Sequence, residues 1–180
     1  MTRLDTDTIA AIATARGNGP VGIIRLSGPN SYAIAYALSG SVLTPRYAHY
    51  RSFLDSEGHA IDSGLAIYFP GPNSFTGDDV VEIQGHGGHI VLQALLSRCI
   101  ELGARQARPG EFSERSFVNG KIDLLQAEAI ADLITAETET AAKLASASLS
   151  GAFSVLVSDL SDQLNELRAL TEASIDCLLY

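Results

Sequence analysis

The sequence is poor in cysteine and has no long apolar run. Its two cysteines, Cys99 and Cys177, stand too far apart for a disulfide framework or a zinc motif. No apolar run approaches the roughly 18–20 residues that cross a bilayer. The charged segment Met1–Asp7 lacks the apolar stretch of a signal peptide. These absences predict a cytoplasmic protein in a reducing compartment, with no membrane association.

Basic residues are also scarce. The chain has 12 Lys and Arg against 21 Asp and Glu, which gives a net charge of −9. The first 122 residues contain 10 basic and 11 acidic residues, whereas the remainder contains 2 and 10. Affinity for nucleic acid depends on neutralisation of phosphates by Lys and Arg. We therefore expect that this chain does not bind nucleic acid by itself.

A phosphate-binding loop of the form GxxxxGK[ST] is missing as well. Only Lys121 and Lys143 are available, and neither follows such a loop or precedes Ser or Thr. This motif is a strong indicator of an NTPase. Without it, the chain is not expected to hydrolyse GTP by itself.

The first two thirds of the sequence alternate between strand and helix patterns. Short apolar, β-branched runs predict strands, whereas turn residues followed by apolar residues at helical spacing predict helices. The predicted strands are 8–14, 21–27, 47–54, 61–69 and 80–84, with a hairpin at Asp55–His59 and a loop at Pro70–Asp78; the predicted helices are 32–38 and 90–102. This alternation predicts an α+β domain over residues 1–120.

After Gly120 the pattern becomes helical. Asp123 and Gln126 form a capping pair at a helix start. Apolar residues then recur at helical spacing, Gly151 interrupts them, and no proline follows Pro109. We predict two long amphipathic helices in residues 121–180. Their apolar faces must be buried by packing against each other, against the first domain or against additional polypeptide.

Two groups of residues stand out chemically. Arg25 and Glu82 are charges inside otherwise apolar strands, which favours a specific charged site, although a solvent-facing position is the simpler interpretation for Glu82. The glycine-rich tract GHGGH contains His86 and His89, which could ligate a metal. No acidic or cysteine partner stands at a familiar spacing, so a glycine-dense turn before a helix is the favoured interpretation. We predict no metal site.

Four long motifs occur in one order: DTIAAIAT, GPVGIIRLSGP, PGPNSFTGDDVVEIQGHGG and ARPGEFSERSFVNGKIDLLQAEAIADLI. Together they resemble the N-terminal part of the bacterial tRNA modification GTPases called MnmE or TrmE. The likeness runs from about Asp7 to about Asp176. It implies a tetrahydrofolate-binding domain similar to that of glycine-cleavage T-protein, followed by the first part of an α-helical domain with long antiparallel helices.

The resemblance also implies a site and partners. The folate contacts of the family fall on Arg25, Glu82 and Lys121, and the ligand is a 5-formyl- or 5,10-methylene-tetrahydrofolate. Such proteins form homodimers through the N-terminal domain. With a flavoprotein called MnmG or GidA, which carries FAD, they modify carbon 5 of the wobble uridine of certain tRNAs. GTP, Mg²⁺ and K⁺ belong to a GTPase domain that this chain lacks.

The sequence departs from the family pattern at its end. EASID is followed by Cys177–Tyr180 in place of a segment that leads to the GTPase domain, and Cys177 does not stand in the family's cysteine motif. We therefore expect a shortened N-terminal portion, with no catalytic residue of its own. Its alternative function is a structural assembly or dimerisation fragment without folate or GTP chemistry.

Overall fold

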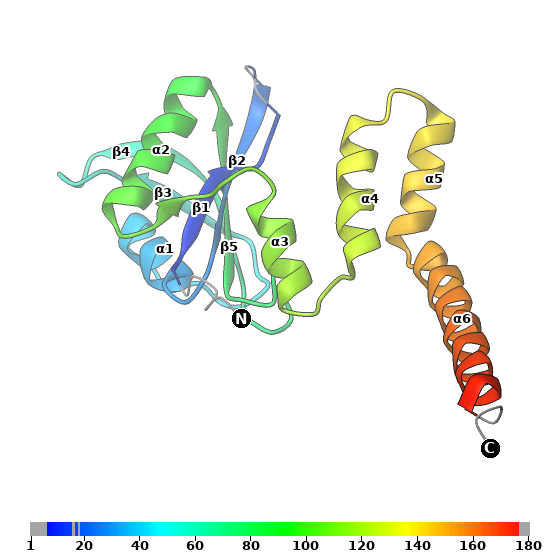
Figure 1. Cartoon of the computed structure of the whole chain (residues 1–180). Helices are drawn as coiled ribbons and strands as arrows, with labels where there is room; N and C mark the ends of the chain where they lie inside the picture. Colours follow the sequence, from blue (N-terminus) through cyan, green and yellow to red (C-terminus); the bar gives the residue numbers. More distant parts are fainter. Residues whose placement is uncertain (1–6, 16, 18, 177–180) are drawn as a thin grey trace. The chain divides into compact units, whose positions relative to one another are not determined.

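The computed structural model describes residues 7–15, 17 and 19–176, so the predictions for Met1–Thr6 and for Cys177 lie outside it. The chain divides into two compact units, residues 1–121 and 122–180. The first unit combines a six-stranded mixed sheet with three helices, and the described part of the second unit contains helices and no strand. The fold is α+β, as predicted (Figure 1).

The strands of the first unit form one sheet with the order β3-β4-β5-β2-β1-β6. Their bounds are β1 (Ile9–Ile12), β2 (Gly19–Ser27), β3 (His49–Leu54), β4 (Ala60–Phe69), β5 (Val80–Gly87) and β6 (Arg105–Gln106). All neighbours pair antiparallel except β1 and β6, which are parallel. The predicted hairpin is confirmed, because β3 and β4 pair on either side of a turn closed by Asp55.

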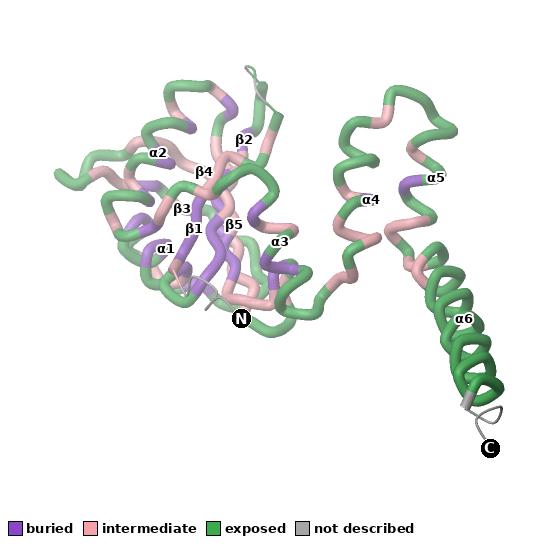
Figure 2. The backbone as a smooth tube through the Cα atoms, in the orientation of Figure 1, coloured by how far each residue is buried: buried purple, intermediate pink, exposed green. Residues whose placement is uncertain are grey.

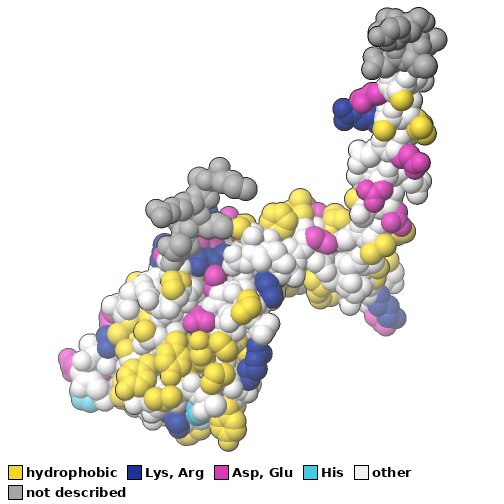
Figure 3. All heavy atoms as spheres, turned by 90° about the horizontal axis from the view of Figure 1, so that it is seen from below, with side chains coloured by type: hydrophobic (Ala, Val, Ile, Leu, Met, Phe, Trp, Pro, Cys, Tyr) yellow, Lys and Arg dark blue, Asp and Glu magenta, His cyan; other side chains and the backbone are white. Residues whose placement is uncertain are grey.

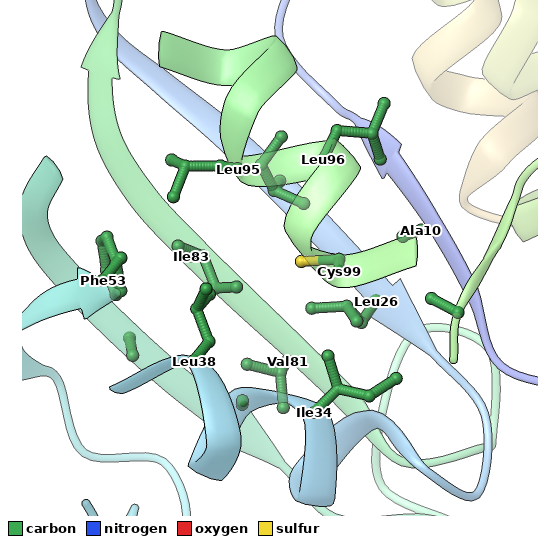
Figure 4. Packing of buried hydrophobic residues seen from close by; sticks show 14 of the residues in the cluster. Ala10, Leu26, Ile34, Leu38, Phe53, Val81, Ile83, Leu95, Leu96 and Cys99 are labelled. Atoms are coloured by element: carbon green, nitrogen blue, oxygen red, sulfur yellow. The ribbon is translucent and has the colours of Figure 1, made fainter. Parts of the chain in front are cut away.

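Helices α1 (Ser31–Ser39) and α2 (His89–Glu101) pack on one face of the sheet. Figure 4 shows their apolar side chains meeting those of β2 and β5. The core includes Ile24 and Leu26 from β2, Val81 and Ile83 from β5, and Ile34, Leu38, Leu95 and Cys99 from the helices. Because side chains alternate along a strand, the residues between these core positions face the other side of the sheet.

One local prediction in this unit was wrong. The tract around His86 is not a turn: β5 continues through Gly87, and α2 begins directly after Gly88. A side chain at Gly87 would lie 2.5 Å from the carbonyl oxygen of Gly19, so glycine permits close pairing of β5 with β2. Helix α2 buries Leu92, Leu95, Leu96 and Cys99, whereas Ile90 in its first turn is 78% exposed.

Helix α3 (Glu111–Val118) completes the first unit and was not anticipated. It begins after Gly110, whose φ of 76° lies in the left-handed region that favours glycine. Figure 1 shows α3 on the opposite side of the sheet from α1 and α2.

The described residues of the second unit, 122–176, form three helices instead of the two predicted ones. They are α4 (Leu124–Thr135), α5 (Glu139–Leu149) and α6 (Ala152–Asp176). The break between α4 and α5 arises at Thr138, whose hydroxyl accepts a hydrogen bond from the N–H of Ala141 and begins a new helix. The predicted capping box of Asp123 and Gln126 is confirmed.

Helix α6 keeps its apolar stripe exposed. Leu156, Leu160, Leu164 and Leu167 are each between 57% and 66% exposed. Figure 2 shows α6 exposed along almost its whole described length, and Figure 3 shows hydrophobic side chains between the acidic ones on this helix. Within the described part of the chain, this stripe therefore has no cover.

Candidate functional site

The two strand charges singled out from the sequence lie side by side. Arg25 of β2 and Glu82 of β5 are direct partners in the antiparallel register. The Nε and Nη2 atoms of Arg25 both donate to Oε1 of Glu82, at 2.9 and 2.6 Å. Their side chains are 30% and 17% exposed. Since the flanking residues face the core, this pair lies on the sheet face opposite α1 and α2.

Two aromatic rings accompany the guanidinium of Arg25. Its central carbon lies over the ring of Phe75, 5.6 Å from the centroid, and over the ring of Phe112, 5.9 Å from the centroid. Both distances fall within the range of a cation–π interaction. Phe75 belongs to the loop between β4 and β5, and Phe112 to the first turn of α3. Neither residue was predicted from the sequence.

The loop that carries Phe75 is fixed from two directions. The hydroxyls of Thr76 and Ser27 lie 2.6 Å apart and are buried, which joins the loop to β2. Ser116 of α3 donates its hydroxyl to the carbonyl oxygen of Phe75 at 2.8 Å. Asn119, directly after α3, donates its side-chain amide to the carbonyl oxygen of Thr76 at 2.7 Å. The loop and α3 therefore form one assembly beside the Arg25–Glu82 pair.

Lys121, the third predicted site residue, lies against the same loop. A Cβ added at Gly77 would be 3.3 Å from both Cγ and Cδ of Lys121, and the N–H of Lys121 donates to the carbonyl oxygen of Ser116 at 2.8 Å. Among the described residues, no hydrogen bond or ion pair joins its side chain to Arg25 or Glu82. The structure thus places Lys121 beside the loop of Phe75, without joining it to the charged pair.

A buried ionic cluster anchors the start of α3. Glu111 is 2% exposed and accepts hydrogen bonds from Arg105, from Arg115 and from the backbone N–H of Arg108. Asp7 binds Arg105 and Arg115 as well. The hydrogen bonds from Arg105 are the largest cause that lowers the pKa of Glu111 to about 2. Through this cluster, Arg105 of β6 and Asp7, two residues before β1, hold the helix that carries Phe112.

The alternative metal site finds no support among the described residues. No group of three His, Cys, Asp or Glu side chains there could hold a metal ion. His86 instead binds Asp62, whose carboxylate lies 2.7 Å from Nδ1 and accepts the backbone N–H of His86 at 2.7 Å. Burial opposes the charge of Asp62, yet these hydrogen bonds outweigh it and lower the pKa of that carboxyl. Cys99 is buried, and its burial raises the pKa of its thiol to about 12, which makes it unreactive.

No single helix among the described residues is long and apolar enough to cross a membrane. Helices α5 and α6 together have the length and apolar composition of a membrane span, but the chain bends by 57° between them.

Comparison with known proteins decides the family. Residues 8–121 match the family described as GTP-binding protein TrmE N-terminus, and residues 124–177 match the MnmE helical domain. The chain belongs to the TrmE family. The tRNA modification GTPase MnmE of Pseudomonas paraeruginosa is 63% identical over 171 residues, which cover 95% of this chain and 38% of that protein. MnmE of Pseudomonas syringae is 61% identical over 170 residues, which cover 94% of this chain and 37% of that relative.

The chain thus spans less than two fifths of the length of these relatives and corresponds to the N-terminal part of a tRNA modification GTPase. The two family matches meet between residues 121 and 124, where the chain divides into its two compact units. The charged pair, the aromatic rings and Lys121 all lie in the TrmE N-terminus match.

Proposed function

We propose that residues 1–121 form the folate-binding and dimerisation domain of a tRNA modification GTPase. The observation that carries this proposal is the Arg25–Glu82 pair beside two aromatic rings on the face of the sheet opposite α1 and α2. Both charges are largely shielded from solvent, and they stand beside the rings of Phe75 and Phe112. The site residues are Arg25, Glu82 and Lys121.

The chemical groups at the site are suited to binding a reduced folate. A carboxylate such as Glu82 accepts hydrogen bonds from the amino and ring N–H groups of a pterin. The exposed cation of Lys121 suits the carboxylates of the glutamate tail. A bound folate derivative would supply the one-carbon unit for modification, and the part of this chain is to bind and orient it.

We extend this proposal to the whole protein on the basis of the resemblance. The whole protein acts in the cytoplasm on carbon 5 of the wobble uridine of certain tRNAs, together with an FAD-containing flavoprotein of the MnmG type. GTP, Mg²⁺ and K⁺ serve the GTPase domain of the full-length relatives. The relatives named above are tRNA modification GTPases, which supports the tRNA substrate and the GTP chemistry of this proposal.

Replacing Glu82 by Gln is expected to weaken binding of 5-formyl-tetrahydrofolate by roughly 10- to 100-fold, because a charge-assisted hydrogen bond is typically worth about 1.5–3 kcal/mol. Isothermal titration calorimetry measures the loss, and thermal unfolding verifies the fold. His86→Ala is the control: its imidazole binds Asp62 and should contribute little to affinity. Equal affinity of Glu82→Gln and the wild type, with both folded, would remove Glu82 from the site.

The chain is expected to be a homodimer in solution, formed through the first domain. Sedimentation velocity at tens of micromolar, an order-of-magnitude choice for a stable dimer, measures the mass. Residues 1–121 alone should sediment as a dimer too, whereas a monomeric full chain would contradict dimerisation.

A second candidate function is a structural assembly fragment without folate chemistry. The exposed leucine stripe of α6 favours it, because such a surface is typical of a contact with further protein. Folate titration separates the two candidates: heat release on adding reduced folate supports the first, and its absence supports the second.

A further inference from the structure

The Arg25 guanidinium is restrained on several sides. Two of its nitrogens bind one carboxylate oxygen, and two rings lie within 6 Å of its central carbon. The rings belong to separate segments, the Phe75 loop and α3, which the hydrogen bond from the Ser116 hydroxyl to the Phe75 carbonyl oxygen connects. Its position is therefore determined by the assembly of these segments against the sheet.

This arrangement has a consequence for the carboxylate of Glu82. A carboxylate oxygen offers two lone pairs, and Oε1 receives both the Nε and the Nη2 hydrogen bonds of Arg25. No described residue donates a hydrogen bond to Oε2. The carboxylate is thus held in one orientation, with Oε2 as its open acceptor.

We propose that Arg25 is a positioning residue for Glu82: it holds the carboxylate through Oε1, and the folate donates its N–H groups to Oε2. Phe75 and Phe112 act through Arg25 by keeping its guanidinium in place. The folate part of this inference rests on the proposed function. Arg25 thereby acts on the folate through Glu82, and the working site includes two further aromatic residues, Phe75 and Phe112.

The first experiment measures the restraint without any ligand. In the 180-residue chain, the Arg25 Nε–H should exchange slowly with solvent in an NMR experiment, because Oε1 accepts it beneath two rings. Phe112→Leu keeps an apolar side chain but removes the ring, and should speed this exchange. Phe117→Leu is the matched control, since Phe117 lies on the same helix and is 42% exposed. Phe112→Tyr retains a ring and should keep the exchange slow.

The second experiment measures folate affinity of the same variants by calorimetry with 5-formyl-tetrahydrofolate. Phe112→Leu should weaken binding about threefold to tenfold, the range of a cation–π interaction, and Phe112→Tyr should restore it. In an Arg25→Ala background, Phe112→Leu should cause no further loss, because a residue that acts through Arg25 has no effect without it.

The outcomes separate the inference from the proposed function. Unchanged Nε–H exchange in a folded Phe112→Leu variant would overturn the positioning role. If Phe112→Leu weakened folate binding as much in the Arg25→Ala background as in the wild type, the positioning role would also be overturned. Phe112 would then contact the ligand directly. A wild-type chain that binds no folate, yet shows the expected exchange pattern, would refute the proposed function and leave Arg25 as the residue that orients Glu82.

Discussion

Replacing Glu111 by Gln is expected to lower the free energy of unfolding of the first unit by about 3–5 kcal/mol, the usual effect of removing one partner from a buried ion pair. The carboxylate is 2% exposed and Arg115 is 7% exposed, so the guanidinium of Arg115 would remain buried with less compensation. Both carboxylate oxygens of Glu111 accept hydrogen bonds from Arg105, Arg108 and Arg115, whereas the side chain of Gln has only one oxygen acceptor. Urea denaturation followed by circular dichroism measures the change.

Glu114→Gln is the matched control for this variant. It makes the same substitution three residues later on α3, where the side chain is 52% exposed and pairs only with Arg108 among the described residues. Exposed ion pairs contribute about 0–1 kcal/mol, so this variant should unfold nearly like the wild type. Equal destabilisation by the two substitutions would mean that the ionic cluster does not anchor α3.

The same cluster predicts how stability depends on pH. The folded-state pKa of Glu111 is about 2, below its ordinary value of 4.5. A carboxyl with a lowered pKa contributes stability above its unfolded-state pKa, and that contribution disappears as the pH falls toward the folded-state value. The wild type should therefore lose stability steeply between about pH 4.5 and 2, with Asp7 adding to the loss because its pKa is lowered as well. Glu111→Gln should show a shallower decline over the same interval.

Much of the fold could be predicted because its signals are local. The β3–β4 hairpin, the helix that ends at Gly40 and the capping box of Asp123 each depend on residues within a few positions of one another. The break at Thr138 was missed because apolar residues continue at helical spacing across it, so periodicity alone suggests one helix. The hydroxyl of Thr138 interrupts that helix by capping a new one.

The site could be predicted only in part. Arg25 and Glu82 are visible as charges within apolar strands, and their pairing follows once β2 and β5 are neighbours. Phe75 and Phe112 carry no such signal, since each stands in a segment without regular periodicity and reaches Arg25 only through tertiary packing. Likewise, nothing near Glu111 in the sequence indicates that it accepts hydrogen bonds from Arg105 and Arg115 while buried.

Gly64→Ala is expected to destabilise the sheet by about 3 kcal/mol, at the upper end of the usual range for overpacking. An added Cβ would lie 1.9 Å from the carbonyl oxygen of Gln84 in the neighbouring strand β5. Because that atom belongs to the backbone, β4 and β5 would have to separate, and the pairing of Leu65 with Gln84 would weaken. Thermal unfolding of the variant measures the loss.

The matched control for this last variant is Gly19→Ala in β2, where the nearest atom to an added Cβ is 3.7 Å away and the substitution meets only ordinary contact. Gly64→Ala should also weaken folate binding, since Gln84 stands two residues from Glu82 and a displaced β5 moves the carboxylate away from Arg25. Gly19→Ala should leave both the unfolding temperature and folate affinity close to those of the wild type. If the two variants unfold at the same temperature, the close approach of β4 to β5 at Gly64 does not support the sheet or the position of Glu82.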